Sequence, residues 1–340
     1  MIIFRVDANS MIGKAHMKRC IEIAKAVKLL GGKVLFVTRE DSDVTMLTNS
    51  FMEYKTVPSM TLGSEKAINC LKEIITENDS KVCVVDSYDV SDAAFKSLRE
   101  VCKVILIEDY LYDVYDVDCV VNYNIYVDRF DYTNKYNYKT DLLLGTDYAP
   151  YIGENYGIRK LDNHQDISSI LVYTGELDQH ELAPGIVDAL LDNVDDSVRV
   201  RVVVGKNSST RDLLYKMSNT SSQIIIEQDL SNISKVLKSC DIAVTVADSF
   251  CYVLLSYMVP SCVYMSDYSQ SMLKDSLVSQ ELMVDGGDFV NKSNKFYDDL
   301  LIGVSSLAYE DLRKKLCTKI AKCSFGKGAN NLAKAIMSYE

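Results

Sequence analysis

The 340-residue sequence contains no tryptophan, only four prolines and only fifteen glycines. So little proline and glycine excludes a collagen-like chain, and 48% hydrophobic residues exclude a disordered one. No apolar run reaches the length of about 18 residues that a membrane span requires, so we expect none. The first seven residues also lack the basic segment and long apolar core of a signal peptide. At about 150 residues per domain, the length predicts two folded domains.

Basic residues are scarce as well, 37 against 48 acidic ones, and the formal net charge is −11. A protein that binds nucleic acid without sequence preference gains most of its affinity by neutralising phosphates with Lys and Arg. This charge balance therefore argues against a nucleic-acid partner, although it leaves a local basic patch open.

The common cofactor and metal motifs are missing too. There is no Walker A sequence and no GxGxxG, so neither ATP nor a dinucleotide is implied. The ten cysteines form no CxxC pair and no Cys/His cluster, and three scattered histidines make a poor ligand set. Several cysteines stand inside apolar runs such as residues 82–85, which is typical of buried thiols in a reducing cytosol. We expect a cytoplasmic protein with no metal and no cofactor.

Short β-branched runs alternate with helical patterns along most of the chain. This alternation predicts an α/β fold with parallel sheets that are covered by helices. The expected strands are residues 2–6, 33–38, 82–86, 104–107, 119–121, 169–173, 198–204, 223–226, 241–246 and 262–265. The expected helices are residues 17–30, 64–77, 91–101, 181–191, 210–218, 231–238, 250–258, 270–281, 305–321 and 329–338.

The alternation lapses between residues 122 and 165, a stretch rich in Tyr, Asp and Asn. We expect an N-terminal domain of residues 1–160 and a C-terminal domain of residues 161–340. The last helix of the C-terminal domain could cross back to the N-terminal domain. Two Rossmann-like domains that face each other leave a cleft, which is a common place for a small-molecule site.

The loop Asp7–His16 joins the first strand to the first long helix. Ligands of open parallel sheets bind beyond the carboxyl ends of the strands, and the N-terminus of the next helix favours an anion. Gly13 permits a backbone shape that other residues resist. His16 titrates near neutral pH, as a general base should. The alternative is a capping or surface histidine, and His164 and His180 are expected to be solvated.

The second half opens with a similar junction at Thr174, Gly175 and Glu176, which could line a phosphate or sugar pocket or form an ordinary turn. Asp248 and Ser249 follow another strand, and one of them is expected to cap the next helix. The 22 tyrosines could stack on a base or sugar, although most are expected to serve packing.

The opening of the chain resembles a known family. The residues are Phe4-Arg5-Val6-Asp7 and Ile12-Gly13-Lys14-Ala15-His16 followed by Arg19, close to the family pattern FRxD…IGxGHxxR. Further similarities are Asp86-Ser87-Tyr88, Asn122-Tyr123-Asn124-Ile125-Tyr126, Gly145–Ala149 and Gly326–Ala329. The family that these residues resemble is that of the UDP-2,4-diacetamido-2,4,6-trideoxy-β-L-altropyranose hydrolases of pseudaminic acid biosynthesis, with related spore-coat polysaccharide proteins.

This resemblance implies a GT-B architecture, similar to that of the lipid II-forming N-acetylglucosaminyltransferase. It implies metal-independent hydrolysis in which water attacks the anomeric carbon and UDP leaves with inversion. His16 would position or deprotonate the water, and Tyr88 would contact the sugar. The implied substrate-binding residues are Arg5, Asp7, Gly13, Lys14, Arg19, Asn124 and Tyr126. The implied nucleotide-binding residues are Thr174, Gly175, Glu176, Asp248, Ser249, Ser269 and Gln270.

The departures from the family pattern lie mostly on the nucleotide side. Val253 stands where the family carries a glutamate that binds the ribose hydroxyls, and Ser269 replaces an asparagine. Thr174 and Ala15 each replace a glycine. Loss of a charged ribose contact would cost about 1.5–3 kcal/mol, roughly ten- to hundredfold in affinity.

Three functions are therefore open. The first is a hydrolase of a nucleotide-activated deoxy-amino sugar in surface or flagellin glycan synthesis, and the second is a GT-B glycosyltransferase. The third is a non-catalytic relative that binds a sugar nucleotide or a partner enzyme. His16 favours catalysis, whereas Val253 favours the non-catalytic alternative.

Overall fold

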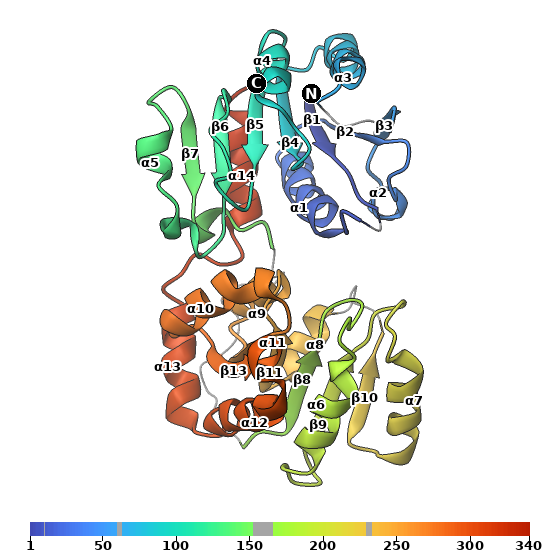
Figure 1. Cartoon of the computed structure of the whole chain (residues 1–340), viewed down its shortest axis with the longest axis vertical. Helices are drawn as coiled ribbons and strands as arrows, with labels where there is room; N and C mark the ends of the chain where they lie inside the picture. Colours follow the sequence, from blue (N-terminus) through green and yellow to red (C-terminus); the bar gives the residue numbers. More distant parts are fainter. Residues whose placement is uncertain (10, 60–62, 152–165, 229–232) are drawn as a thin grey trace. The chain divides into compact units, whose positions relative to one another are not determined.

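The computed structural model describes residues 1–9, 11–59, 63–151, 166–228 and 233–340. The chain divides into two compact units, which we call the first unit (residues 1–152 and 327–340) and the second unit (residues 153–326). The expected domain boundary at residues 160 and 161 lies outside the described residues. In Figure 1 the first unit carries the blue-to-green elements together with the red C-terminal helix.

The first unit is built on a seven-stranded parallel sheet with the order β3-β2-β1-β4-β5-β6-β7. The strands are β1 (Ile2–Val6), β2 (Val34–Arg39), β3 (Tyr54–Val57), β4 (Val82–Asp86), β5 (Lys103–Ile107), β6 (Cys119–Asn122) and β7 (Asp141–Leu144). Its helices are α1 (Ala15–Leu29), α2 (Thr45–Asn49), α3 (Glu65–Glu77), α4 (Asp92–Arg99), α5 (Tyr132–Lys135) and α14 (Gly328–Met337), with short turns η1 (Val127–Arg129) and η2 (Thr146–Tyr148).

The central strands are apolar because both faces of the sheet are covered, as parallel sheets require. On one face, Ile3 and Cys83 belong to a buried cluster with Leu71 of α3 and Phe95 of α4. Side chains alternate along a strand, so Phe4 points to the opposite face. The sheet is thereby held between two helical layers.

The C-terminal helix α14 packs against α1 of the first unit. Its first residue, Gly328, approaches the loop before the second unit so closely that a Cβ would lie 2.0 Å from the carbonyl oxygen of Ala149. Asn331 donates to the Asp147 carbonyl at 2.8 Å. Only glycine fits at position 328, which explains the glycine in this part of the chain.

The second unit repeats the architecture with a six-stranded parallel sheet in the order β10-β9-β8-β11-β12-β13. Its strands are β8 (Ser169–Tyr173), β9 (Arg199–Val203), β10 (Ile224–Glu227), β11 (Ile242–Val246), β12 (Ser261–Met265) and β13 (Val284–Asp288). Its helices are α6 (Leu182–Leu191), α7 (Arg211–Thr220), α8 (Ile233–Ser239), α9 (Phe250–Ser256), α10 (Ser271–Ser279), α11 (Phe289–Lys292), α12 (Phe296–Ser306) and α13 (Glu310–Ile320), with turns η4 (Tyr268–Gln270) and η5 (Ser293–Lys295).

Both sheets have the strand order of a Rossmann fold, so the predicted fold class is confirmed. The prediction missed three edge strands, β3, β7 and β13. The sequence of β13, Val-Asp-Gly-Gly-Asp, is not strand-like, yet Gly286 fits there because a Cβ would lie 2.7 Å from the Cys262 sulfur. The helix expected at residues 305–321 is wrong at its start, since α12 ends at Ser306 and α13 begins at Glu310.

No helix among the described residues has both the length and the apolar composition of a membrane span.

Candidate active site

The loop between β1 and α1 places His16 at the carboxyl edge of the first sheet. Gly13 has φ +79° and its N–H donates to the Asn9 carbonyl at 2.8 Å. The Asn9 side chain accepts from the backbone N–H groups of Met11 and Ile12 at 2.9 and 2.8 Å. This closed loop leads directly into α1, whose first helical turn contains His16. The His16 residue is only 8% exposed.

His16 is paired with Asp86, the last residue of β4. The two atoms in contact, His16 Nδ1 and Asp86 Oδ1, lie 2.6 Å apart. Burial by itself raises the pKa of Asp86, but the charges and hydrogen bonds of Arg19 and His16 outweigh it and hold this pKa well below its usual range. Arg19 Nη2, which can only donate, also lies 2.9 Å from His16 Nδ1. An ionised carboxylate only accepts hydrogen bonds, so Asp86 favours the neutral tautomer with the proton on Nδ1 and a lone pair on Nε2, which is the tautomer that a general base needs.

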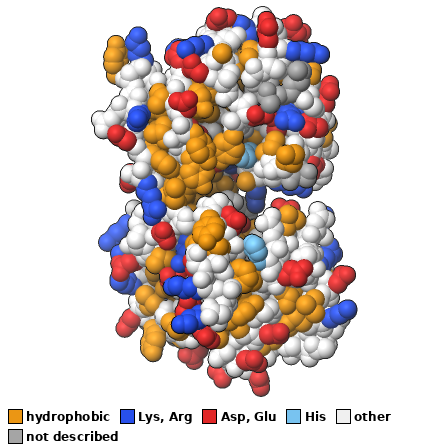
Figure 2. All heavy atoms as spheres, in the orientation of Figure 1, with side chains coloured by type: hydrophobic (Ala, Val, Ile, Leu, Met, Phe, Trp, Pro, Cys, Tyr) orange, Lys and Arg blue, Asp and Glu red, His pale blue; other side chains and the backbone are white. Residues whose placement is uncertain are grey.

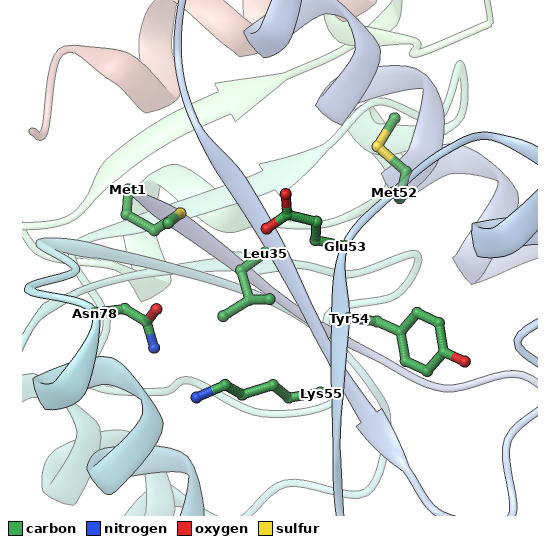
Figure 3. A pocket seen from close by; sticks show the side chains of 7 residues that line it. All are labelled: Met1, Leu35, Met52, Glu53, Tyr54, Lys55 and Asn78. Carbon is green, nitrogen blue, oxygen red and sulfur yellow. The ribbon is translucent and has the colours of Figure 1, made fainter.

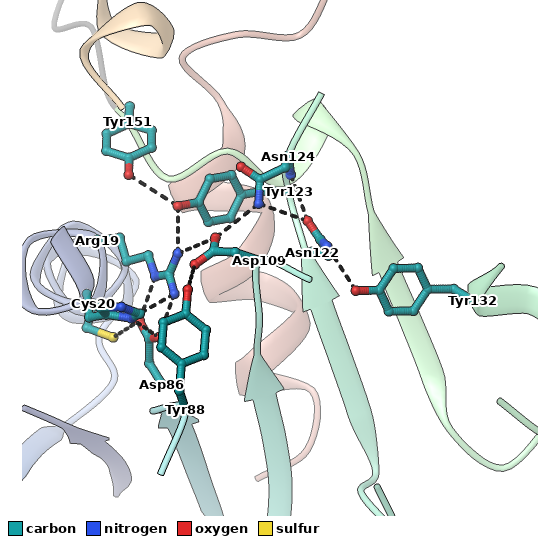
Figure 4. Close-up of polar contacts among 11 residues, drawn as sticks. Arg19, Cys20, Asp86, Tyr88, Asp109, Asn122, Tyr123, Asn124, Tyr132 and Tyr151 are labelled. Carbon is teal, nitrogen blue, oxygen red and sulfur yellow. Dashed lines mark hydrogen bonds and ion pairs between the residues drawn. The ribbon is translucent and has the colours of Figure 1, made fainter. Parts of the chain in front are cut away.

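Arg19 lies one helical turn beyond His16 and joins two carboxylates. Its Nε and Nη2 donate to Asp86 Oδ2 and Oδ1, both at 2.6 Å. Its Nη1 donates to Asp109 Oδ1 at 2.7 Å and to the Tyr123 hydroxyl at 2.9 Å. Arg19 is 3% exposed, and its guanidinium supports the site from beneath. Figure 4 shows this guanidinium between the two acidic side chains.

Asp109, two residues after β5, connects Arg19 to Tyr88. The Tyr88 hydroxyl donates to Asp109 Oδ2 at 2.5 Å. The Tyr88 ring meets the imidazole of His16 edge-on, with 4.9 Å between the ring centroids. Tyr88 is 56% exposed, so it has surface left for a ligand beside the histidine.

Asn124 completes the network from the loop after β6. Its Nδ2 donates to Asp109 Oδ1 and to Asn122 Oδ1, both at 3.0 Å. The Asn122 side chain donates to the Tyr132 hydroxyl at 2.9 Å. Figure 4 follows these contacts from α1 through β4, β5 and β6. In the N-x-N motif, Asn124 therefore binds Asp109 directly, and Asn122 holds Asn124 in place.

A cavity of about 330 Å³ opens in front of His16 within the first unit. It is lined by Asp7, Asn9, Met11, Ile12, His16, Arg39, Asp86, Ser87, Tyr88 and Asp89. This volume is at the lower end of the range for small-molecule sites, and the lining combines charged groups with apolar ones. A second depression of about 390 Å³ (Figure 3) lies near the amino ends of β2 and β3, away from this carboxyl edge.

The other residues predicted for this half take supporting positions. Asp7 lines the cavity, and its Oδ1 pairs with Arg5 at 2.7 Å and accepts from Arg39 N at 2.8 Å. Arg5 is 1% exposed, and Lys14 pairs with Asp43 at 3.2 Å.

Tyr126 lies within a group of aromatic rings. It is 7% exposed, and its ring packs against Tyr110 and Phe130 with centroids 6.1 and 6.3 Å apart. Figure 2 shows side chains of the hydrophobic class gathered on the visible face of the first unit.

The nucleotide-side residues all belong to the second unit, after β8, β11 and β12, which are adjacent in its sheet. Gly175 has φ +92°, and Glu176 is exposed. Asp248 Oδ1 accepts from the N–H of Phe250 at 2.7 Å, which is the capping role expected, whereas Ser249 makes no side-chain cap bond. Thr174 stands between β8 and the Gly175 turn.

Ser269 and Gln270 form a capping box with Asp267. The Ser269 N–H and hydroxyl donate to Asp267 Oδ1 at 2.8 and 2.5 Å. Gln270 Oε1 accepts from the N–H groups of Ser266 and Asp267 at 2.8 and 3.2 Å. Val253 is half-buried on α9 and offers no polar atom for a ribose.

Sequence reasoning left Asp86, Asp109 and Tyr123 off the set of site residues. A signal was available for the first two, because Asp86 ends β4 and Asp109 follows β5, the next strand in the sheet, and the carboxyl ends of parallel strands meet at one edge. The Arg19 contacts to Asp86 and Asp109 span 67 and 90 residues, and nothing local in the sequence predicts them.

The chain resembles a curated relative of known name. It is 23% identical over 254 residues to UDP-2,4-diacetamido-2,4,6-trideoxy-beta-L-altropyranose hydrolase of Campylobacter jejuni, which covers 73% of this chain and 85% of the relative. The resemblance drawn from the motifs is confirmed. No family model matches the chain.

Among solved structures, Acinetobacter baumannii MurG superposes with a TM-score of 0.70 at 10% identity, over 99% of both chains. The spinosyn forosaminyltransferase SpnP gives a TM-score of 0.65 at 10% identity, also over 99% of both chains. The fold is of the GT-B type. At these identities the likeness concerns the fold alone, and the site must be argued from its own side chains.

Proposed function

We propose that this protein is a hydrolase of a UDP-activated deoxy-amino sugar, in which His16 is the general base. The observation that carries the proposal is the His16–Asp86 pair beside a cavity of ligand size, because a carboxylate at Nδ1 favours the tautomer in which Nε2 can accept a proton. The named relative supports the substrate class, since its own substrate is a UDP-linked diacetamido sugar.

The proposed reaction is a single displacement at the anomeric carbon. His16 Nε2 takes a proton from water while the water oxygen bonds to C1. The bond between C1 and the phosphate oxygen breaks, and its electron pair leaves with UDP. Asp86 stabilises the imidazolium that forms, as the carboxylate of a catalytic triad does, and Arg19 holds Asp86 in place. Tyr88, whose ring packs edge-on against His16, would contact the sugar. The family resemblance implies that no metal takes part.

The test measures UDP released from UDP-sugars by the full chain and by His16→Gln. Removal of a general base lowers the rate by about 10²–10⁴-fold, and we expect a loss in that range. His180→Gln is the matched control, because His180 is exposed in the second unit and is expected to leave the rate unchanged. Equal rates for His16→Gln and the unmodified chain would remove His16 from the mechanism.

A glycosyltransferase is the second candidate, favoured by the fold shared with the forosaminyltransferase SpnP. In that reaction His16 would deprotonate an acceptor hydroxyl in place of water. The two functions separate in an assay without acceptor, because only the hydrolase then releases UDP at a catalytic rate. Release that begins only when a saccharide acceptor is added would support the transferase. A chain that binds UDP but releases none under either condition would support the non-catalytic alternative.

A further inference from the structure

Glu108 is a buried carboxyl group that the proposed mechanism does not use. It directly follows β5 and precedes Asp109, and it is 5% exposed. Asp109 is bound to Arg19, whereas the Glu108 Oε1 atom is buried without a hydrogen-bond partner among the described residues. Burial raises the pKa of Glu108 to about 7, although the Tyr132 hydroxyl favours its charged form. A buried acceptor without a donor is costly, so this atom is a strong candidate for contact with a ligand.

The environment of Glu108 is a small cavity of about 30 Å³. Its walls combine polar and apolar side chains: Ser87, Tyr88, Val90, Phe95, Leu106, Glu108, Tyr112 and Tyr115. Phe95 and Leu106 are 0% and 2% exposed and have almost no free surface, whereas the apolar parts of Val90 and Tyr115 are only half-buried. The space suits one or two water molecules or a chemical group of similar size.

This small cavity adjoins the larger one in front of His16. Ser87 and Tyr88 line both of them. A ligand held beside His16 could therefore extend one substituent past Tyr88 toward Glu108.

The substituent that matches these walls has a hydrogen-bond donor next to a small apolar end. A hydroxyl group would satisfy Glu108 but leave the apolar wall without contacts. An acetamido group supplies both parts, since its N–H can donate to Oε1 and its methyl group can pack on Val90 and the Tyr115 ring.

We propose that the Glu108 cavity is the subsite for an N-acetyl substituent of the activated sugar, with Glu108 accepting the amide N–H. The inference rests on the proposed function for the presence of a nucleotide sugar. It goes further in assigning recognition of the acyl group to Glu108 and to the apolar wall beside it.

The experiment compares the binding of UDP-N-acetylglucosamine and UDP-glucose, which differ only in carrying an acetamido or a hydroxyl group at one carbon. Dissociation constants are measured by calorimetry with the full chain. We expect the acetamido compound to bind at least tenfold more tightly. In Glu108→Leu this ratio falls to within threefold of unity, while the dissociation constant of UDP alone stays unchanged. In Glu108→Gln, which keeps an acceptor oxygen, most of the ratio remains.

A ligand series tests the size of the cavity without relying on any variant. The N-propionyl analogue of the same UDP-sugar carries one more methylene, which the cavity of about 30 Å³ does not accommodate. We expect it to bind the unmodified chain at least tenfold more weakly than the acetyl compound. Equal binding of the acetyl and propionyl compounds, or an unchanged ratio in Glu108→Leu, would mean that the cavity holds only water and would overturn the proposal.

These outcomes are separate from the fate of the proposed function. Discrimination between the two sugars without UDP release contradicts the hydrolase and leaves the subsite standing. UDP release with no discrimination contradicts the subsite and leaves the hydrolase standing. Failure of UDP itself to bind contradicts the proposed function.

Discussion

The carboxyl edges of the two sheets share one strand order but hold different kinds of side chain. In the first unit, Arg19, Asp86 and Asp109 form a buried charged group that reaches from α1 to β5. In the second unit, Asp248 and Asp267 bond mainly to the backbone of their own loops. The comparison shows that the Rossmann topology provides a carboxyl edge in both sheets, whereas the side chains at that edge decide whether it holds a charged group suited to catalysis.

The largest expected effect on stability comes from removing the Arg19 guanidinium, the cation of the buried charged group in the first unit. Arg19→Met leaves two buried carboxylates without their partner, which typically destabilises a protein by about 3–5 kcal/mol. Urea denaturation measures the free energy of unfolding. The matched control is Arg201→Met in the second unit. Arg201 Nη1 lies 2.6 Å from Glu227 Oε1, and because both side chains are partly exposed, the expected loss is at most about 1 kcal/mol. Equal losses would erase the contrast between the two edges.

The Asp86 carboxylate provides the second test. In Asp86→Asn the amide can donate to His16 Nδ1, which moves the imidazole proton to Nε2 and removes the base. We expect UDP release to fall by roughly 10²–10⁴-fold, with UDP affinity unchanged. Asp248→Asn, at the equivalent edge of the second unit, keeps an oxygen that can accept from the Phe250 N–H, so we expect little change in stability and any loss to fall on UDP affinity rather than on the rate at saturating substrate. A rate that survives in Asp86→Asn contradicts the tautomer assigned to His16.

Glu108 and Asp109 extend the comparison within the first unit, because the pKa values of these two adjacent carboxyl groups shift in opposite directions. Burial raises the pKa of both, but Arg19 overcomes this at Asp109 and lowers its pKa, whereas the pKa of Glu108 reaches about 7. A raised pKa means that the folded state holds the proton more tightly than the unfolded state. The Glu108 contribution is therefore complete below the unfolded pKa of 4.5 and is lost as pH rises through 7.

We expect the free energy of unfolding to lose about 3 kcal/mol from this group between roughly pH 4 and pH 8. Glu108→Gln cannot titrate and should lack this component, which denaturation at a series of pH values would measure. Tyr132 and Asp109, which face Glu108, remain in both proteins. Parallel pH profiles would contradict the raised pKa.

The smallest effect is a gain in the second unit. Val253→Glu would restore the carboxylate that the family resemblance implies for the ribose, and UDP affinity should rise by roughly ten- to hundredfold. Calorimetry with UDP measures it, and Val253→Leu serves as the control for side-chain bulk. No gain would mean that this position on α9 does not contact the nucleotide.

Much of the fold follows from local patterns. Buried parallel strands such as β1 and β4 are apolar throughout, and amphipathic helices such as α1 fill the connections, so both are visible in the sequence. The edge strand β3 has three exposed residues out of four and shows no such pattern. Gly286 of β13 is explained by the nearby Cys262, which lies 24 residues earlier in the chain.

The site divides in the same way. His16 and its glycine turn are encoded within ten residues, so the motif alone identified the histidine. Its partner Asp86 is 70 residues away, and the Arg19 contact to Asp109 spans 90 residues. These distances close only because β1, β4 and β5 are neighbours in the sheet.

The amino-acid sequence alone therefore determined the alternation of strands and helices and the histidine at the first strand-to-helix junction, because periodicity and turn chemistry are local properties. The tertiary structure decided which carboxylate contacts that imidazole, since Asp86 comes from another strand. It also decided which of two adjacent acids is paired and which is left facing a cavity, because a cation from α1 reaches only one of them.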